Sequence, residues 1–401
     1  MKARARHSLV AAAVGAVLVG PMLSSKAGAA AWEFNPTVEA GYLYDDNYRL
    51  NLPGTEISVE GPMVDAQLEL LARTQASELS LTPRVRATYF SNEPNLDAVD
   101  YFATIDWLHH GQRVLTRVRA DVADQDIVNS EQPNASAGGG LGDPDLGDAG
   151  RVLVENRRMR ASLRPSMSFD LSARREILLG AGYTDVTFDN QFAGAQVDFN
   201  ATDLSAGLLT RLNERSTLTT SVNGARYEIG NSDPQNSYGA ELQWDLSTAA
   251  QTRTYLRGGA KNVDLASGDS QVAWIAGAGT AWLAGRNDWF IDLSRNVGPT
   301  SAGALVTRDE LRVRFTRAMT PRLSLQAGVR GTTDDAVDPA STFEKRKYVT
   351  GDVGLQWRWL EEFSVRFAYD YTWQDFRNDT VSAASSGALI SFLYQPLQRS
   401  R

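Results

Sequence analysis

Residues 363–374 read Phe-Ser-Val-Arg-Phe-Ala-Tyr-Asp-Tyr-Thr-Trp-Gln, and this stretch decides the fold. Every odd-numbered residue is apolar or aromatic, and the even-numbered residues are polar or small. Side chains alternate between the two faces of a β-strand, so this pattern predicts one strand with two chemically opposed surfaces. A helix would scatter both sets around its circumference.

The same alternation recurs along the whole chain after the first thirty residues. Most of the segments run for about ten to fourteen residues, longer than the ~5–6 of ordinary strands and long enough to cross a membrane when tilted. About 18 such segments are predicted, with starts near residues 34, 62, 77, 99, 112, 157, 175, 199, 216, 237, 252, 271, 287, 306, 322, 346, 362 and 386.

The connections between these segments alternate between short and long. Short ones centre on sites such as Thr74-Gln75 and Ala173-Arg174, and long ones include 45–61 and 126–150. Outer-membrane barrels have short periplasmic turns and longer external loops. We therefore predict an all-β fold: a single antiparallel transmembrane β-barrel of about 18 strands (16–18), with both termini on the periplasmic side. A soluble β-sandwich also has alternating strands, but it gives no reason for this segregation of turn lengths.

The N-terminal residues 1–31 have the order of a secretory signal peptide. Lys2, Arg4 and Arg6 precede an apolar run at 9–19, and small residues offer cleavage positions near 29–31. The alternative is an uncleaved N-terminal anchor. The predicted organisation is a signal peptide at 1–31 and an outer-membrane barrel at 32–401, in which residues 389–394 end the last strand and 395–401 follow it as a tail.

Composition excludes several classes of function. The chain has no cysteine, which excludes thiol catalysis and thiolate metal sites, and its net charge of -8 argues against a nucleic-acid partner. No cofactor motif is present. Beyond the signal segment the histidines are His109 and His110, which are adjacent and so point to opposite faces of a strand. We therefore expect no enzymatic activity.

The polar face is rich in arginine, and charges placed on the lipid face would cost ~2–4 kcal/mol each near the midplane. These side chains could form a somewhat basic conduit for anionic or hydroxyl-rich solutes, or a structural ladder of Arg–carboxylate pairs. An excess of inward arginines over inward acids favours the conduit slightly. The residues predicted to line the lumen are Arg84, Arg86, Arg117, Arg119, Arg158, Arg160, Arg164, Arg312, Arg314, Arg358, Arg366, Asp121, Asp352 and Asp370.

The long connections are acidic. Asp143, Asp145 and Asp148 follow three glycines and are weak candidates for holding a hard cation, although their spacing does not match a calcium loop of the helix–loop–helix kind. A solvated Gly/Asp loop is the simpler interpretation. The connection at 126–150 is the longest, and it could fold into the lumen as a constriction.

The first predicted strand reads Glu39-Ala-Gly-Tyr-Leu-Tyr-Asp-Asp-Asn47, followed by Arg49-Leu50 and Leu52-Pro53. This stretch resembles the opening of the second family of outer-membrane β-barrel porins, which is encoded in exopolysaccharide biosynthesis operons. The segments at 82–89 and 100–108 also look similar. The resemblance is motif-level over roughly 33–110 and implies a role in polysaccharide secretion, but it supplies no catalytic residues. Tyr48 is a minor departure from the pattern.

Three functions remain open on the sequence. The first is a passive conduit for secretion of an exopolysaccharide, working with periplasmic secretion machinery. The second is a general or anion-preferring diffusion porin for small anionic solutes. The third is a closed structural or adhesive barrel whose acidic loops meet partners. All three place the protein in the lipid bilayer of the outer membrane.

Overall fold

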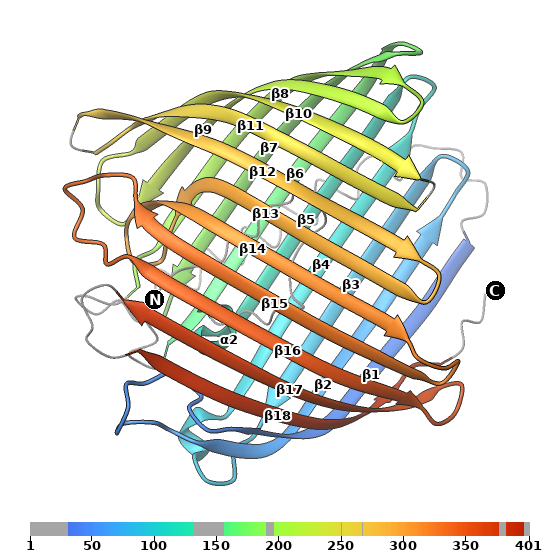
Figure 1. The fold of residues 1–401 in the computed structure, drawn as a ribbon, viewed down its shortest axis with the longest axis vertical. Coiled ribbons are helices and arrows are strands. Elements are labelled where there is room, and N and C mark those ends of the chain that lie inside the picture. Colours follow the sequence, from blue (N-terminus) through green and yellow to red (C-terminus); the bar gives the residue numbers. More distant parts are fainter. Residues whose placement is uncertain are drawn as a thin grey trace.

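The chain folds into one closed antiparallel sheet of eighteen strands, seen here in a computed structural model (Figure 1). The structure describes residues 31–131, 156–189, 196–249, 251–266, 268–376 and 382–396. Each strand pairs with its neighbours in sequence, and β1 also pairs with β18, which closes the wall. The prediction of an all-β, 18-stranded barrel is confirmed. Among the described residues no helix is long and apolar enough to cross a membrane.

The predicted strand starts lie within three residues of the observed ones. The strands are β1 (Ala31–Asp45), β2 (Val59–Arg73), β3 (Ser77–Thr88), β4 (Ala98–His110), β5 (Val114–Asp126), β6 (Arg157–Ser172), β7 (Arg175–Phe188), β8 (Phe199–Asn213), β9 (Ser216–Ile229), β10 (Gln235–Ala249), β11 (Thr252–Asp264), β12 (Ser270–Ala284), β13 (Asn287–Pro299), β14 (Leu305–Ala318), β15 (Leu323–Ala336), β16 (Arg346–Arg358), β17 (Phe363–Phe376) and β18 (Ala383–Tyr394). A 3-10 turn, η2 (Pro94–Leu96), and a short helix, α2 (Ile127–Glu131), interrupt the connections.

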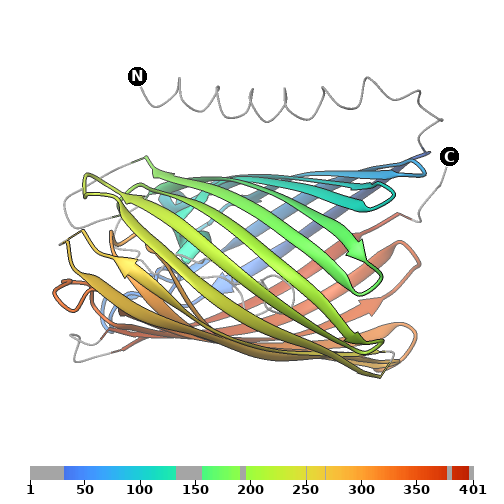
Figure 2. The same cartoon turned by 90° about the horizontal axis from the view of Figure 1, so that it is seen from above.

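The two rims of the barrel differ in the length of their connections. Two to four residues join strands at one rim, and five to thirty join them at the other. The long connections lie on the left of Figure 1, and the strands cross the wall obliquely, as Figure 2 shows. The described chain begins at Ala31 and ends at Pro396 on the short-turn rim. By the usual arrangement of these barrels, the short-turn rim is periplasmic and the long connections are external.

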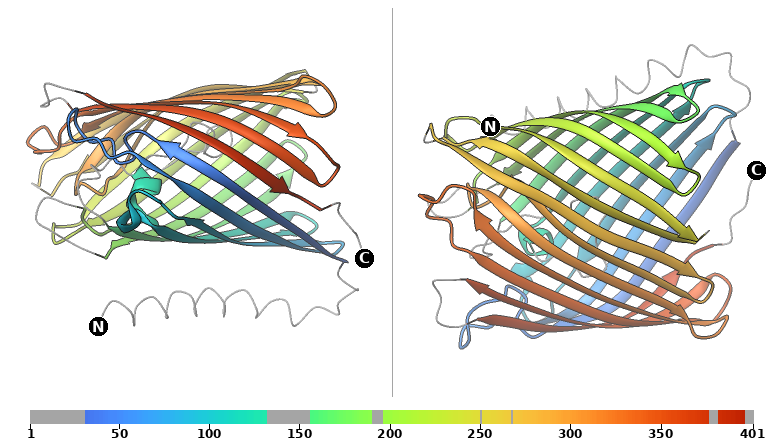
Figure 3. Two further views of the ribbon diagram at one scale, coloured as in Figure 1. Left: turned by 90° about the horizontal axis from the view of Figure 1, so that it is seen from below. Right: turned by 45° about the horizontal axis from the view of Figure 1, so that its top comes forward.

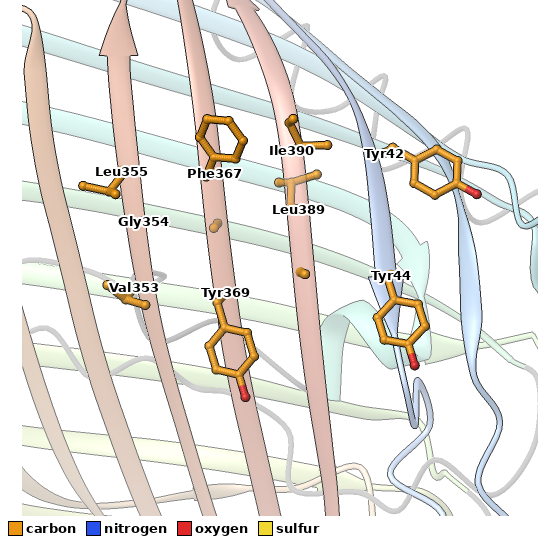
Figure 4. Close-up of a pocket in the computed structure, with 11 residues that line it drawn as sticks. Tyr42, Tyr44, Val353, Gly354, Leu355, Phe367, Tyr369, Leu389 and Ile390 are labelled. Atoms are coloured by element: carbon orange, nitrogen blue, oxygen red, sulfur yellow. The ribbon is translucent and has the colours of Figure 1, made fainter.

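The outer face of the wall is apolar over its middle. Directly paired residues of an antiparallel sheet lie on the same face, so the register shows which residues of each strand point outward. Aromatic side chains stand exposed on this face, among them Phe34 at 60% and Trp274 at 59%. Figure 4 shows Tyr42, Phe367 and Tyr369 around an outer-wall hollow of about 500 Å³ across β16–β18 and β1. An apolar band with aromatic borders on a closed barrel faces lipid, so this is an outer-membrane β-barrel.

The seam between β1 and β18 is shorter than the other ladders. Pairing covers Val38–Asp45 opposite Gly387–Tyr394, whereas β1 pairs with β2 along its whole length. Continuing the seam register by two residues would bring Pro396 opposite Pro36, and proline has no N–H to donate to a ladder. The ladder therefore stops at Tyr394, where the sequence predicted the last strand to end. The tail beyond Pro396 lies outside the described residues.

A cysteine pair tests this register, because the natural chain contributes no thiol. Leu43 lies opposite Leu389 with both side chains on the inner face. In Leu43→Cys/Leu389→Cys we expect a disulfide to form readily, because directly opposed residues lie about 4.5–5.5 Å apart. The shifted pair Leu43→Cys/Leu393→Cys is offset by about 13 Å along the strand and should stay reduced. Non-reducing gels of the folded protein measure both, and equal oxidation would contradict the register.

Candidate functional site

The inner face of the wall is the candidate site. The register of the ladders places every side chain that the sequence predicted for the lumen on this face, from Arg84 on β3 to Asp370 on β17. Arg117, Arg119 and Asp121 lie along β5, and Arg158, Arg160 and Arg164 lie along the neighbouring β6. These charges therefore form bands around the lumen.

Four of these arginines, Arg84, Arg117, Arg119 and Arg312, have a carboxylate partner on the same or an adjacent strand. Arg84 lies 2.5 Å from Asp65, and Arg119 lies 3.2 Å from Asp121. Arg117 makes an ion pair with Asp106 on the neighbouring strand. These three pairs are half-exposed to the lumen, so each contributes little to stability. The structure therefore contains Arg–carboxylate pairs between neighbouring strands, which was one of the two arrangements that the sequence left open for the polar face.

The predicted excess of inward arginines is wrong for the described strands. Acids near strand ends, acids next to other charges and acids in the middle of strands, such as Asp203 and Asp292, also point inward. They balance the arginines, so the wall is a mosaic of both signs. The missed inward acids are Glu33, Glu39, Asp45, Glu78, Asp100, Asp170, Glu176, Asp203, Asp288, Asp292, Glu310 and Asp334.

One part of the inner wall is a fully buried charge network across β11 and β13–β15. Arg312 lies 2.7 Å from Asp292, and Arg330 lies 2.7 Å from Glu310. The Tyr255 hydroxyl donates to Asp292 at 2.5 Å. The four charged side chains are at most 2% exposed. Buried charges are tolerated where they are paired and hydrogen-bonded, so this network is a rigid element of the wall.

Near the external ends of the strands, the polarity of the two faces is reversed. On β7, Tyr183 points outward, but further along the strand Asp185 is outward while Val186 and Phe188 point inward and are buried. The same reversal occurs on β9, where Glu228 is outward and Ile229 is buried. These strand ends stand above the lipid, with water outside and an apolar cluster within. The shift of the apolar positions from odd to even residues is a sequence signal that could have revealed this.

The helix α2 lies inside the wall near the external rim (Figure 3). Its residues Ile127 and Val128 are buried in an apolar cluster at the external ends of the strands, to which inward side chains such as Phe188 and Ile229 contribute. The prediction that the longest connection enters the lumen is confirmed for this part; 132–155 lies outside the described residues. The cluster comprises Ile127, Val128, Val186, Phe188, Phe199, Ala201, Tyr227, Ile229, Val263, Leu265, Ala273, Val297 and Leu305.

The end of α2 is fastened to other parts of the external rim. The Ser301 hydroxyl donates to Oε1 of Glu131 at 3.2 Å, and Arg346 donates to the Glu131 carbonyl at 3.4 Å. Arg346 also donates to Gln374 at 3.2 Å, and Gln374 donates to the carbonyl of Leu50 at 3.1 Å. This chain of bonds joins α2 to β16, β17 and two external connections, and so fixes the helix at the external rim.

The residues that carry the family resemblance build the first external connection. Asp45 accepts hydrogen bonds from the backbone of Asn47 at 2.8 Å and from the Ser385 hydroxyl at 2.6 Å, which fastens β1 to β18. The buried amide of Asn47 donates to Ala384 at 2.9 Å. Leu50 has a φ of 52°, which is costly for a side chain of this size, and is held there by its contact with Tyr348 and Ala383. The motif is structural: it closes the seam and turns the connection inward.

Tyr48, which departs from the family pattern, packs into this same connection. Its ring meets Phe90 edge-on with centroids 5.1 Å apart. Burial raises the pKa of the Tyr48 phenol, so this side chain stays neutral. The departure is therefore accommodated as an apolar contact.

Whether α2 restricts the path through the barrel can be tested by unseating it. In Ile127→Asp a carboxylate replaces a fully buried side chain, and burying an unpaired charge costs several kcal/mol. We expect α2 to leave the wall and the single-channel conductance to rise. The matched variant Leu115→Asp changes a lumen-facing side chain that is 37% exposed, so its conductance should stay close to that of the parent. Unchanged conductance in Ile127→Asp would show that α2 does not restrict the path.

The other candidate sites do not assemble. His109 accepts from or donates to Ser77 at 2.8 Å, but within the described residues no acid orients the ring as a catalytic triad requires. No cluster of three or more potential metal ligands occurs in the described part of the chain. The weak cation candidates Asp143, Asp145 and Asp148 lie outside the described residues.

No family model and no curated protein matches the chain. It is similar to the structure of Pseudomonas aeruginosa OccK2 (OpdF) in complex with glucuronate, with 12% identity, 91% of this chain and 98% of that chain covered, and a TM-score of 0.48. Pseudomonas aeruginosa OpdQ shares 10% identity over 92% and 98% of the chains, with a TM-score of 0.44. The outer-membrane channel DcaP of Acinetobacter baumannii shares 11% identity over 93% of this chain and 99% of that chain, with a TM-score of 0.44. The closed wall and its apolar outer face make this chain an outer-membrane β-barrel independently of these likenesses.

Proposed function

We propose that this protein is a channel that serves as the passive conduit for secretion of an exopolysaccharide. The observation that carries the proposal is the inner wall, where paired charges of both signs alternate around a lumen. Barrels of 16–18 strands can enclose an aqueous channel. A polar wall with charges of both signs offers sugars many weak hydrogen-bonding sites, and weak, multiple sites are what conduction requires.

The fastened α2 helix bears on the alternatives. A general diffusion porin needs an open path, whereas here a helix inside the wall is fastened at the external rim through Glu131 and Arg346. The balance of charges on the wall also removes the reason to expect a strong preference for small anions. A structural or adhesive barrel would have a lumen that conducts under no condition.

Planar-bilayer recording on the purified mature protein separates these functions. An export conduit should show a conductance that is blocked by a long polysaccharide and not by small anions. Steady conductance with small-anion selectivity and no polysaccharide block would support the diffusion porin and contradict the proposal. If neither the parent protein nor Ile127→Asp conducts, the result would support the closed structural or adhesive barrel.

A further inference from the structure

We infer that the periplasmic rim carries an arginine ring that loads a polyanionic saccharide into the lumen. This inference rests on the proposed function and adds a substrate class to it. The ring consists of exposed arginines at or beside seven consecutive periplasmic turns, from β4–β5 to β16–β17. They are Arg113, Arg174, Arg175, Arg215, Arg253, Arg286, Arg317, Arg322 and Arg358.

The arginines of the ring differ in their partners from the paired arginines of the wall. Wall arginines such as Arg117 and Arg312 make ion pairs. Within the described part of the chain, no carboxylate or hydrogen-bond acceptor engages a guanidinium of the ring. Arginine offers five donors in a planar fork that matches carboxylate and phosphate groups. The ring therefore presents unused donors where a solute from the periplasm first meets the barrel.

A small cavity at the inner lip adds a shaped site to this charge. About 320 Å³ in volume, it is lined by Arg113, Asp170, Ser172 and Arg211 among others. Arg211 is held in place by Glu176 at 2.9 Å and by the carbonyl of Ala173 at 3.2 Å. The volume is at the small end of ligand pockets, which span about 300–1,000 Å³. It suits one charged sugar unit of a longer chain.

The two rims have opposite charge. The external connections contain sixteen acidic and four basic residues, whereas the eight periplasmic turns contain five arginines and three carboxylates. Fields of this kind raise the local concentration of an oppositely charged solute. A polyanion would gather at the entrance and find no attractive site at the exit, which favours its release outside. A neutral polysaccharide would not respond to either rim.

The register separates the ring into two groups that allow a matched test. Arg253 and Arg358 share the inner face with lumen residues, whereas Arg175 and Arg317 share the outer face with lipid-facing ones. All four are exposed. Anionic lipid headgroups would engage the outer pair, and a polymer entering the lumen would engage the inner pair. Arg253→Gln/Arg358→Gln and Arg175→Gln/Arg317→Gln remove the same charge from the two groups.

The experiment measures block of the single-channel current by polygalacturonate added to one side at a time, with dextran as the neutral polymer. A single cysteine introduced by Ala340→Cys, at an exposed external position, reports the orientation through a membrane-impermeant thiol reagent. We expect half-block at a lower concentration from the periplasmic side. In the inner variant this concentration should rise about fivefold or more at low salt, as expected for the loss of exposed ion pairs. The outer variant should stay within about twofold, as for surface changes remote from the path.

Three outcomes would overturn the inference: equal block from both sides, equal effects of the inner and outer variants, or equal block by dextran. These outcomes can be told apart from a failure of the proposed function. A channel that conducts steadily and is blocked equally by the polymer from both sides would contradict the arginine ring but not the conduit. If no variant conducts, binding of labelled polygalacturonate to the protein in nanodiscs still tests the ring, because the inner variant should lose this binding and the outer variant should keep it.

Discussion

Asp292→Ala is expected to lower the free energy of unfolding by about 3–5 kcal/mol, since removing one partner leaves a buried charge uncompensated. Arg312 is 2% exposed and has Asp292 as its close carboxylate partner at 2.7 Å, with Glu310 further away at 3.9 Å. The same change removes the acceptor of the Tyr255 hydroxyl. Urea unfolding of the protein in detergent or lipid, followed by tryptophan fluorescence, measures the loss.

Asp106→Ala is the matched control, because it breaks an ion pair of the same kind in the open part of the lumen. The side chain of its partner Arg117 is 52% exposed. Water compensates an exposed guanidinium, so we expect a loss of no more than about 1 kcal/mol. Equal losses in the two variants would mean that the β13–β15 network is not shielded from water, and would contradict the burial described above.

Val329→Arg should destabilise the barrel by about 2–4 kcal/mol, the cost of a basic side chain on the lipid face near the midplane. Val329 stands in the middle of β15, is 47% exposed and lies opposite Val313 and Gly351. A long basic side chain there has lipid on all sides. Unfolding titrations in lipid vesicles measure the loss, which should shrink in detergent micelles, where water comes closer to the wall.

The control for this prediction is Gln326→Arg, three positions away on the same strand. Gln326 pairs with Thr316 and Gly354 on the inner face, so the new charge points into the lumen. Its effect on stability should stay within about 0.5 kcal/mol, as for ordinary solvent-facing substitutions. A larger loss of stability in Gln326→Arg than in Val329→Arg would contradict the assignment of Val329 to the lipid face and of Gln326 to the lumen.

The candidate site was predictable in part, for reasons visible in particular residues. Arg84 and Asp370 lie in strands with clear alternation, so their inward placement followed from the period of two. Glu310 follows Arg308 and Asp309, so the alternation there does not show which of these charges points inward. Its place on the inner face was decided by the register, which puts Glu310 opposite Ser294 on β13. The apolar mouth around Phe188 did not follow from the pattern of the strand middles, because the polarity of the two faces reverses at the external ends of the strands.

The sequence by itself determined the strands, their number and the two opposed faces, because a period of two is a local property of the chain. The alternation of short and long connections likewise determined the orientation of the barrel. The tertiary structure alone decided which charges neutralise each other, that α2 packs against a reversed apolar mouth, and that within the described residues the arginines of the ring have no carboxylate partner. These depend on contacts between residues far apart in the chain, such as Glu131 with Ser301 and Arg346. No local pattern encodes such distances.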